Sequence, residues 1–288
     1  MMEHVLAPFT EFAFMRRALV GVIAIALGSG PVGVFLMLRR MSLTGDAMAH
    51  AILPGAAVGY LVAGLSLPAM TIGGLAAGVV VAVLAGLVAR LTALKEDASL
   101  AAFYLVSLAL GVTIVSLRGS NVDLLHVLFG TVLALDDAAL ILLACITSIT
   151  LATLALAYRP LVLDSVDPVF LRSVSGAGTP VHLIFLGLVV LNLVGGFQAL
   201  GTLLAVGLMM LPAAAARFWS DDVTVMILVA MGIGLASGFV GLLVSFHAEL
   251  PSGPSIILVA GGAYLVSLLV GRTGGLLWLA WPRRHLEA

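Results

Sequence analysis

The sequence predicts an all-α, polytopic membrane protein, and three observations support that prediction. Of its 288 residues, 62% are hydrophobic and 9% are charged, whereas an average soluble domain has about 45–50% apolar and about 25% charged residues. Apolar runs of about 18 residues or more recur along nearly the whole chain, and each can cross a hydrocarbon core as a helix. Glycine supplies 32 residues and clusters inside these runs, where small residues allow close helix packing. We expect one transmembrane domain over residues 1–288.

About nine spans are expected, each bounded by polar residues or by Pro and Gly. They lie near residues 17–38, 47–65, 67–91, 98–117, 138–158, 181–197, 199–216, 223–246 and 255–271. A further stretch, residues 121–135, begins with polar residues and is too short to cross. We interpret it as a re-entrant or surface helix.

The distribution of Lys and Arg orients these spans, because cytoplasmic loops near span ends carry an excess of both. If the first span runs inward, three of the 13 basic residues, Arg16, Arg17 and Arg118, lie on the outer side and the other ten lie in the cytoplasm. The opposite orientation would invert that ratio. The sequence therefore predicts a cytoplasmic C-terminus.

The largest interior loop on the cytoplasmic side then covers residues 159–179. Within it, Asp167 and Pro168 are typical of a helix N-cap followed by Pro at the first helical position, and the glycines at 176 and 178 are typical of a stop. A short helix is expected at about 168–175. It is either a plain connector or a docking helix for a cytosolic partner.

Two titratable residues open the second span. Asp46 and His50 are spaced i, i+4, which places a carboxylate and an imidazole on one helix face, one turn apart. Both are competent ligands for a divalent transition ion, and Pro54 should disturb the helix and free backbone carbonyls. Two ligands are too few for zinc or manganese, but a symmetric dimer supplies four. The alternatives are an Asp46–His50 pair that satisfies itself, or an Asp46 that only caps the span.

Weaker candidates lie near the end of the eighth span. His247 and Glu249 fall in an outward-facing turn, where they either gather an incoming cation or are ordinary solvated residues. Several other classes of protein are excluded. The chain has no GxxxxGK[ST] phosphate loop, no HExxH motif and no GxSxG turn. Cys145 is the only cysteine, and the net charge of -1 leaves no basic patch for nucleic acid.

Five segments, in this order, resemble the membrane-permease subunits of the zinc/manganese uptake ABC transporters. They are LRRMSLTGDAMAHAILPG (residues 38–55), KEDASLA (95–101), HVLFG (126–130), VGLMMLPAAAAR (206–217) and LPSGPS (250–255). The resemblance covers residues 14–271, and the GDAxxHAxLPG element is its most specific part. Ala49 stands where family members usually have Ser.

The resemblance implies a transport subunit rather than an enzyme, with ATP hydrolysed by two separate cytoplasmic ATPase subunits. It further implies a permease homodimer in the lipid bilayer of a bacterial inner or plasma membrane, supplied by an extracytoplasmic metal-binding protein and holding no permanent cofactor. Asp46 and His50 would form the metal site. The segment that contains Asp167, Pro168, Val169, Phe170, Leu171, Arg172 and Ser173 would be the coupling helix.

The transported ion is less sharply defined. Imidazole favours zinc, and carboxylate favours manganese; zinc is preferred because His247 adds an imidazole at the proposed entrance, with manganese or ferrous iron as the alternatives. Two other transporter types compete. A siderophore- or cobalamin-type chelate permease would not need an Asp–His pair. A stand-alone ion-coupled transporter is expected to have charged residues in several spans and an inverted repeat.

Overall fold

The computed structural model describes residues 2–64, 66–92, 96–117, 132–167, 170–171, 173 and 178–277. Within these ranges the chain is helical and contains no strand, which confirms the all-α prediction. The elements are α1 (Met2–Glu11), α2 (Ala13–Leu38), α3 (Ser42–Ala51), α4 (Leu53–Ala63), α5 (Leu67–Leu91), α6 (Glu96–Leu117), η1 (Val132–Ala134), α8 (Asp137–Val166), α10 (Gly178–Leu200), α11 (Thr202–Ala216), α12 (Val223–Ala248) and α13 (Ser252–Val270).

Seven helical stretches in the described part of the chain are long and apolar enough to cross a membrane. Two further expected spans correspond to shorter apolar helices, Ala98–Ile114 within α6 and Thr202–Ala216. The count of nine therefore stays a prediction. Of the expected re-entrant segment, residues 121–131 lie outside the described ranges, and its end forms the short helix η1.

The span expected at 47–65 corresponds to the apolar stretch Thr44–Ala63, which consists of two helices, α3 and α4, that meet at Ile52. This break is the disturbance predicted for Pro54, which cannot donate a backbone hydrogen bond. One expected boundary was wrong. The helix expected to end at residue 158 continues to Val166. Its last two turns pack inward, since Leu161 and Asp164 are buried, so the loop that follows is shorter than predicted.

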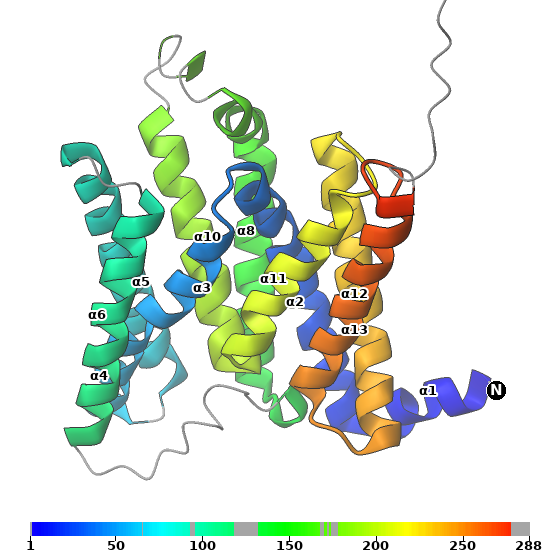
Figure 1. Ribbon diagram of the computed structural model, residues 1–288. Helices are drawn as coiled ribbons and strands as arrows, with labels where there is room; N and C mark the ends of the chain where they lie inside the picture. The colour runs from blue at the N-terminus through cyan, green and yellow to red at the C-terminus, as the bar shows by residue number, and fades with distance from the viewer. Residues whose placement is uncertain are drawn as a thin grey trace, which may run out of the picture.

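Most helices run side by side in one bundle (Figure 1). α4, α5 and α6 form one flank of the bundle, and α12 and α13 form the other. α2 lies between the flanks and packs against α8, α11 and α12. α3 crosses the front of the bundle obliquely and contacts α6, α10 and α11. The helix with the two candidate metal ligands thus lies on a broad face between the flanks.

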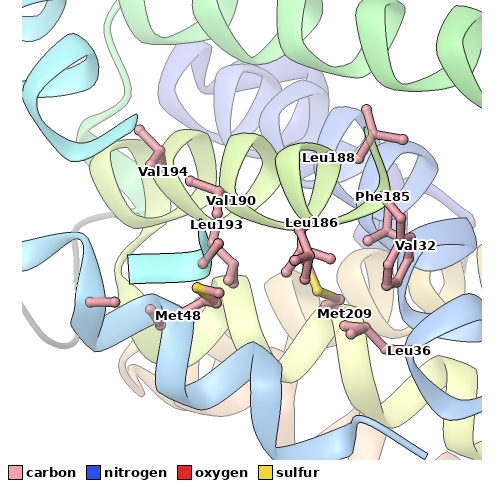
Figure 2. Close-up of a cluster of buried hydrophobic side chains, with 14 of the residues drawn as sticks. Val32, Leu36, Met48, Phe185, Leu186, Leu188, Val190, Leu193, Val194 and Met209 are labelled. Atoms are coloured by element: carbon pink, nitrogen blue, oxygen red, sulfur yellow. The ribbon is translucent and has the colours of Figure 1, made fainter. Parts of the chain in front are cut away.

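The core beneath α3 explains how that helix is held. Figure 2 shows Met48 of α3 pointing toward Leu193 of α10, in a cluster that also includes Leu36 of α2 and Met209 of α11. All four side chains are buried. Because one face of α3 is fixed in this apolar cluster, residues on its other face are left facing outward.

Glycines permit the closest helix contacts. A Cβ at Gly33 would lie 1.8 Å from the Met209 carbonyl oxygen, so no larger residue allows α2 to approach α11 this closely. A Cβ at Gly55 of α4 would similarly lie 1.9 Å from the carbonyl oxygen of Gly73 in α5. These contacts bear out the packing role expected for small residues in membrane helices.

The end of the bundle expected to lie outside carries two of the three basic residues assigned there. The helix α1, which precedes the first span, lies at this end and projects sideways past α12 (Figure 1). Arg16 donates a hydrogen bond to the carbonyl oxygen of Thr10 near the end of α1, 3.1 Å away. Arg17 forms a 3.1 Å ion pair with Asp137 in the first turn of α8. Both arginines therefore have local partners that account for their position.

A candidate metal-binding site on α3

The local sequence places Asp46 inside a helix rather than at its start. α3 begins at Ser42, and its N-cap is Met41, which provides no side-chain cap. Asp46 is thus the fifth residue of the helix, so the alternative that it only caps the span is wrong. Four residues later, His50 lies in the last turn, just before the break at Ile52.

Asp46 and His50 face one another without a hydrogen bond. The Asp46 Oδ1 and His50 Nε2 atoms are 3.8 Å apart, which is beyond hydrogen-bonding distance. His50 Nδ1 is buried and has no hydrogen-bond partner among the described residues. The two side chains are within ion-pairing distance but form no hydrogen bond with each other. A carboxylate and an imidazole form a donor set that suits a divalent transition ion.

A pocket of about 350 Å³ lies between α3 and α11 beside this pair. Asp46, Ala49 and His50 line it from α3, and Thr202, Leu203, Val206 and Gly207 line it from α11. Ala49 thus contributes a methyl group to the lining of the pocket. The centroid of the Tyr104 ring in α6 lies 6.1 Å from that of the His50 ring.

One copy of the chain gives an incomplete coordination shell. The described residues contain no group of three or more His, Cys, Asp or Glu side chains that could hold a metal ion. The Asp46 side chain is 64% exposed and that of His50 is 24% exposed. Further ligands would have to come from outside these two residues.

His247 and Glu249 do not line this pocket. His247 lies exposed in the last turn of α12, with Nδ1 2.9 Å from the carbonyl oxygen of Leu243. Glu249 follows as the C-cap with φ 54° and ψ 34°, a left-handed conformation that ends the helix. An entrance role for the two residues remains a prediction, separate from the α3 pocket.

The helix cap predicted at Asp167 is present. Asp167 Oδ1 accepts a hydrogen bond of 2.8 Å from the backbone N–H of Phe170, as an N-cap does. Ser173 Oγ donates a 2.8 Å bond to the carbonyl oxygen of Phe170. Phe170 is half exposed and Leu171 is buried. Pro168, Val169 and Arg172 lie outside the described residues.

Sequence reasoning missed two features. Thr202 and Val206 line the pocket, but neither belongs to a motif that marks a site on its own. Arg39 forms a buried ion pair with Asp164, although it was counted only as a basic residue that orients the first span. The one signal in the sequence was that both residues lie at ends of spans that are expected to face the cytoplasm and carry opposite charges.

The chain matches the family described as the ABC 3 transport family over residues 11–271. It is 31% identical, over 278 residues, to the manganese transport system membrane protein MntC of Halalkalibacterium halodurans, covering 96% of this chain and 94% of that protein. It is also 31% identical to the manganese import system permease protein ScaB of Streptococcus parasanguinis, covering 90% of this chain and 91% of the relative.

Two solved structures are similar in fold. The complex of PsaBC from Streptococcus pneumoniae with a Fab contains a chain that superposes with a TM-score of 0.85 at 28% identity, covering 97% of this chain and 99% of that one. A structure described as an inward-facing metal-chelate type ABC transporter superposes with a TM-score of 0.71 at 13% identity. The second likeness concerns the fold alone.

Proposed function

The chain belongs to the ABC 3 transport family, and we propose that it is the membrane permease of an importer for a divalent transition-metal ion, with manganese as the favoured cargo. The observation that carries this proposal is the α3 pocket. There, Asp46 and His50, whose Oδ1 and Nε2 atoms are 3.8 Å apart, line a space of about 350 Å³. Ionisable residues inside a membrane span are costly and mark ion pathways.

The choice of manganese rests on chemistry and on the relatives. Carboxylate oxygen suits manganese, and imidazole nitrogen suits zinc as well, so the pair alone is compatible with either ion. The relatives named above are manganese permeases. The reason to prefer zinc was the imidazole of His247, and that residue does not line the pocket. Zinc and ferrous iron are therefore the alternatives that the experiment below tests.

A homodimer would complete the site. An exposed carboxylate on a membrane helix is unfavourable next to lipid, but a second copy packed on the α3 face would cover it. A two-fold axis near α3 would then bring two Asp46 and two His50 side chains to one ion. This arrangement gives four ligands, the number typical of zinc sites, and a divalent manganese ion would add water.

Transport would follow from alternating access of this central site. In the proposed orientation, nine spans place the C-terminus and the Asp167-capped segment in the cytoplasm, where two ATPase subunits would bind. ATP-driven closure of those subunits would move the segment from Asp167 to Ser173 and switch the permease between two states. The ion must bind more weakly in the inward-open state, because only a difference in affinity can drive release.

The ion would arrive on an extracytoplasmic metal-binding protein. That protein would dock at the outer end of the bundle, where the α12–α13 turn with His247 and Glu249 is exposed. In this proposal, the turn helps to guide the docking or the ion, and the α3 pocket holds the ion during transport.

The test is uptake of radiolabelled manganese into proteoliposomes that contain the permease, its ATPase and the metal-loaded binding protein. Asp46→Ala and His50→Ala should each reduce uptake by at least about 100-fold, because losing a direct ligand costs at least as much as losing an outer-shell partner. The matched control is Asp137→Ala, which removes an exposed carboxylate at the outer end. Uptake that persists in either α3 variant would refute the site, and stronger competition by zinc than by manganese would reassign the cargo.

A chelate permease is the second candidate, since the fold is shared with the chelate-type transporter. The pocket of about 350 Å³ lies at the lower end of the about 300–1,000 Å³ range of small-molecule sites. Uptake of the free ion delivered by the binding protein, with no organic chelator present, would argue against this candidate. Uptake that requires a chelator would favour it.

A further inference from the structure

Arg39 lies at the centre of a buried polar cluster at the end of the bundle expected to face the cytoplasm. Its Nη2 atom is 2.9 Å from Asp164 Oδ2, and the two side chains are only 7% and 6% exposed. Arg39 Nε donates to Ser165 Oγ over 3.2 Å. Because a guanidinium only donates, His182 accepts at Nδ1 from Arg39, 3.3 Å away. The guanidinium also lies 4.2 Å from the centroid of the Phe185 ring.

The cluster fixes the point from which α3 departs. After α2 ends, Arg40 adopts a left-handed conformation with φ 59°. The Arg40 N–H donates to the Met37 carbonyl oxygen and the Met41 N–H to that of Leu36, the bond pair of a Schellman motif. α3 starts at the next residue, and Asp46 lies in its second turn. Arg39 is therefore held at the base of the helix that carries both candidate ligands.

The other end of the ion pair leads to the proposed coupling segment. Asp164 lies in the last turn of α8, which ends at Val166. The next residue, Asp167, caps the turn that contains Phe170. The ion pair thus joins the base of α3 to the last helical turn before the proposed ATPase-docking segment. Residues 39 and 164 bring these two elements together although they are far apart in the sequence.

Stability alone is a weak reason for such a pair. Removing two charges from water costs much of what their attraction returns, and replacing a buried ion pair by packed apolar residues is often neutral or stabilising. The chain also has an exposed ion pair, Arg17–Asp137, whose side chains are 47% and 77% exposed. That pair lies at the opposite end of the bundle and touches neither α3 nor the Asp167 segment, so it serves as an internal control.

We propose that Arg39 is a positioning residue for metal import: through its buried ion pair with Asp164, it ties the base of α3 to the Asp167 segment, so that a displacement of that segment moves Asp46 and His50. This inference rests on the proposed function. Phe185 and Ser165 hold the guanidinium from two further directions, which makes the link directional rather than a simple charge contact.

The test replaces the pair by apolar side chains in the double variant Arg39→Met with Asp164→Leu. The full transporter with its ATPase and binding protein is reconstituted, and three quantities are measured: thermal stability, manganese affinity, and manganese imported per ATP hydrolysed. We expect the first two to match those of the wild type and the third to fall by at least about fivefold, the lower end of usual coupling effects. The double variant Arg17→Met with Asp137→Leu should leave all three unchanged.

An unchanged import-to-ATP ratio in the Arg39–Asp164 double variant would overturn the inference, as would an equal fall in the Arg17–Asp137 control. If the apolar variant does not assemble, Asp164→Asn replaces it. Asparagine keeps the size of Asp164 and a hydrogen-bonding oxygen but removes the charge that pairs with Arg39. A lowered ratio with normal stability then supports the inference, and a normal ratio overturns it. Failure of the proposed function itself would be distinct, because the wild type would then import no manganese.

Discussion

Two polar regions of the bundle differ in whether their side chains have hydrogen-bond partners. Asn192 on α10 is buried, and its Nδ2 donates to Thr150 Oγ1 over 2.8 Å and to the Leu188 carbonyl oxygen over 2.9 Å. Nearby, Thr147 on α8 donates to the Ala24 carbonyl oxygen of α2. On α3, by contrast, Asp46 and His50 stand 3.8 Å apart beside an open pocket, and His50 Nδ1 has no partner among the described residues.

Under the proposed function, the difference separates polar groups that hold the scaffold from polar groups that are available to bind an ion. Hydrogen bonds between membrane helices contribute modestly, about 0.6 kcal/mol on average and up to about 1.7, and the Asn192 cluster uses them to join α2, α8 and α10. The α3 pair makes no such contribution. Its groups stay available because the apolar face of α3, which includes Met48, already anchors the helix (Figure 2).

The largest difference in stability is expected when Asn is replaced by Asp in one region and Asp by Asn in the other. Asn192→Asp places a carboxylate in the middle of the bundle, where an acidic residue costs about 2.5–3.5 kcal/mol by insertion measurements. We expect a matching loss of stability, measured by thermal unfolding in detergent. Asp46→Asn removes a charge from an outward-facing position and should change stability by no more than about 0.5 kcal/mol, while manganese uptake is lost.

Two results would break this comparison. If Asp46→Asn unfolds the protein as severely as Asn192→Asp, the α3 pair is part of the scaffold. If Asn192→Asp retains full stability instead, the polar cluster around residue 192 stabilises a buried carboxylate.

A smaller effect is expected at Gly28, which borders the same cluster. A Cβ there would lie 2.8 Å from Asn192 Oδ1 and 3.2 Å from Thr147 Oγ1. Gly28→Ala should therefore destabilise the protein by about 1–3 kcal/mol, the usual cost of overpacking. Gly187→Ala is the matched control, because nothing lies within 4 Å of its Cβ position, and both changes gain the same helix propensity. Equal unfolding temperatures for the two variants would contradict the tight packing inferred around Asn192.

Much of the fold could be predicted from the sequence because the bilayer restricts the choices. Apolar length sets the helices, so spans such as α2 and α12 were placed to within a few residues. The break at Ile52 was signalled by Pro54. The extension of α8 to Val166 was not, because its last turns are held by the distant contact between Asp164 and Arg39. Periodicity within one span carries no information about such a contact.

The candidate site, like the fold, could be predicted only in part. Helical spacing placed Asp46 and His50 on one face, and the structure puts both on one pocket. The second wall, formed by Thr202 and Val206 of α11, could not be inferred. Those residues have no distinctive chemistry, and only the oblique course of α3 across the bundle brings them to the site (Figure 1).

The smallest effect on uptake is expected at the α12–α13 turn. Its exposed polar groups belong neither to the Asn192 cluster nor to the α3 pair, so they provide a third case for the comparison. His247→Ala with Glu249→Ala removes two exposed side chains away from the α3 pocket. Stability and maximal uptake should stay at the wild-type level. The concentration of metal-loaded binding protein that gives half-maximal uptake should rise by no more than about threefold, because charges at the rim of an interface act mainly on association. Uptake measured over a range of binding-protein concentrations separates these quantities. A collapse of maximal uptake, as in Asp46→Ala, would place an essential metal ligand at this turn and reduce the α3 pocket to a secondary site.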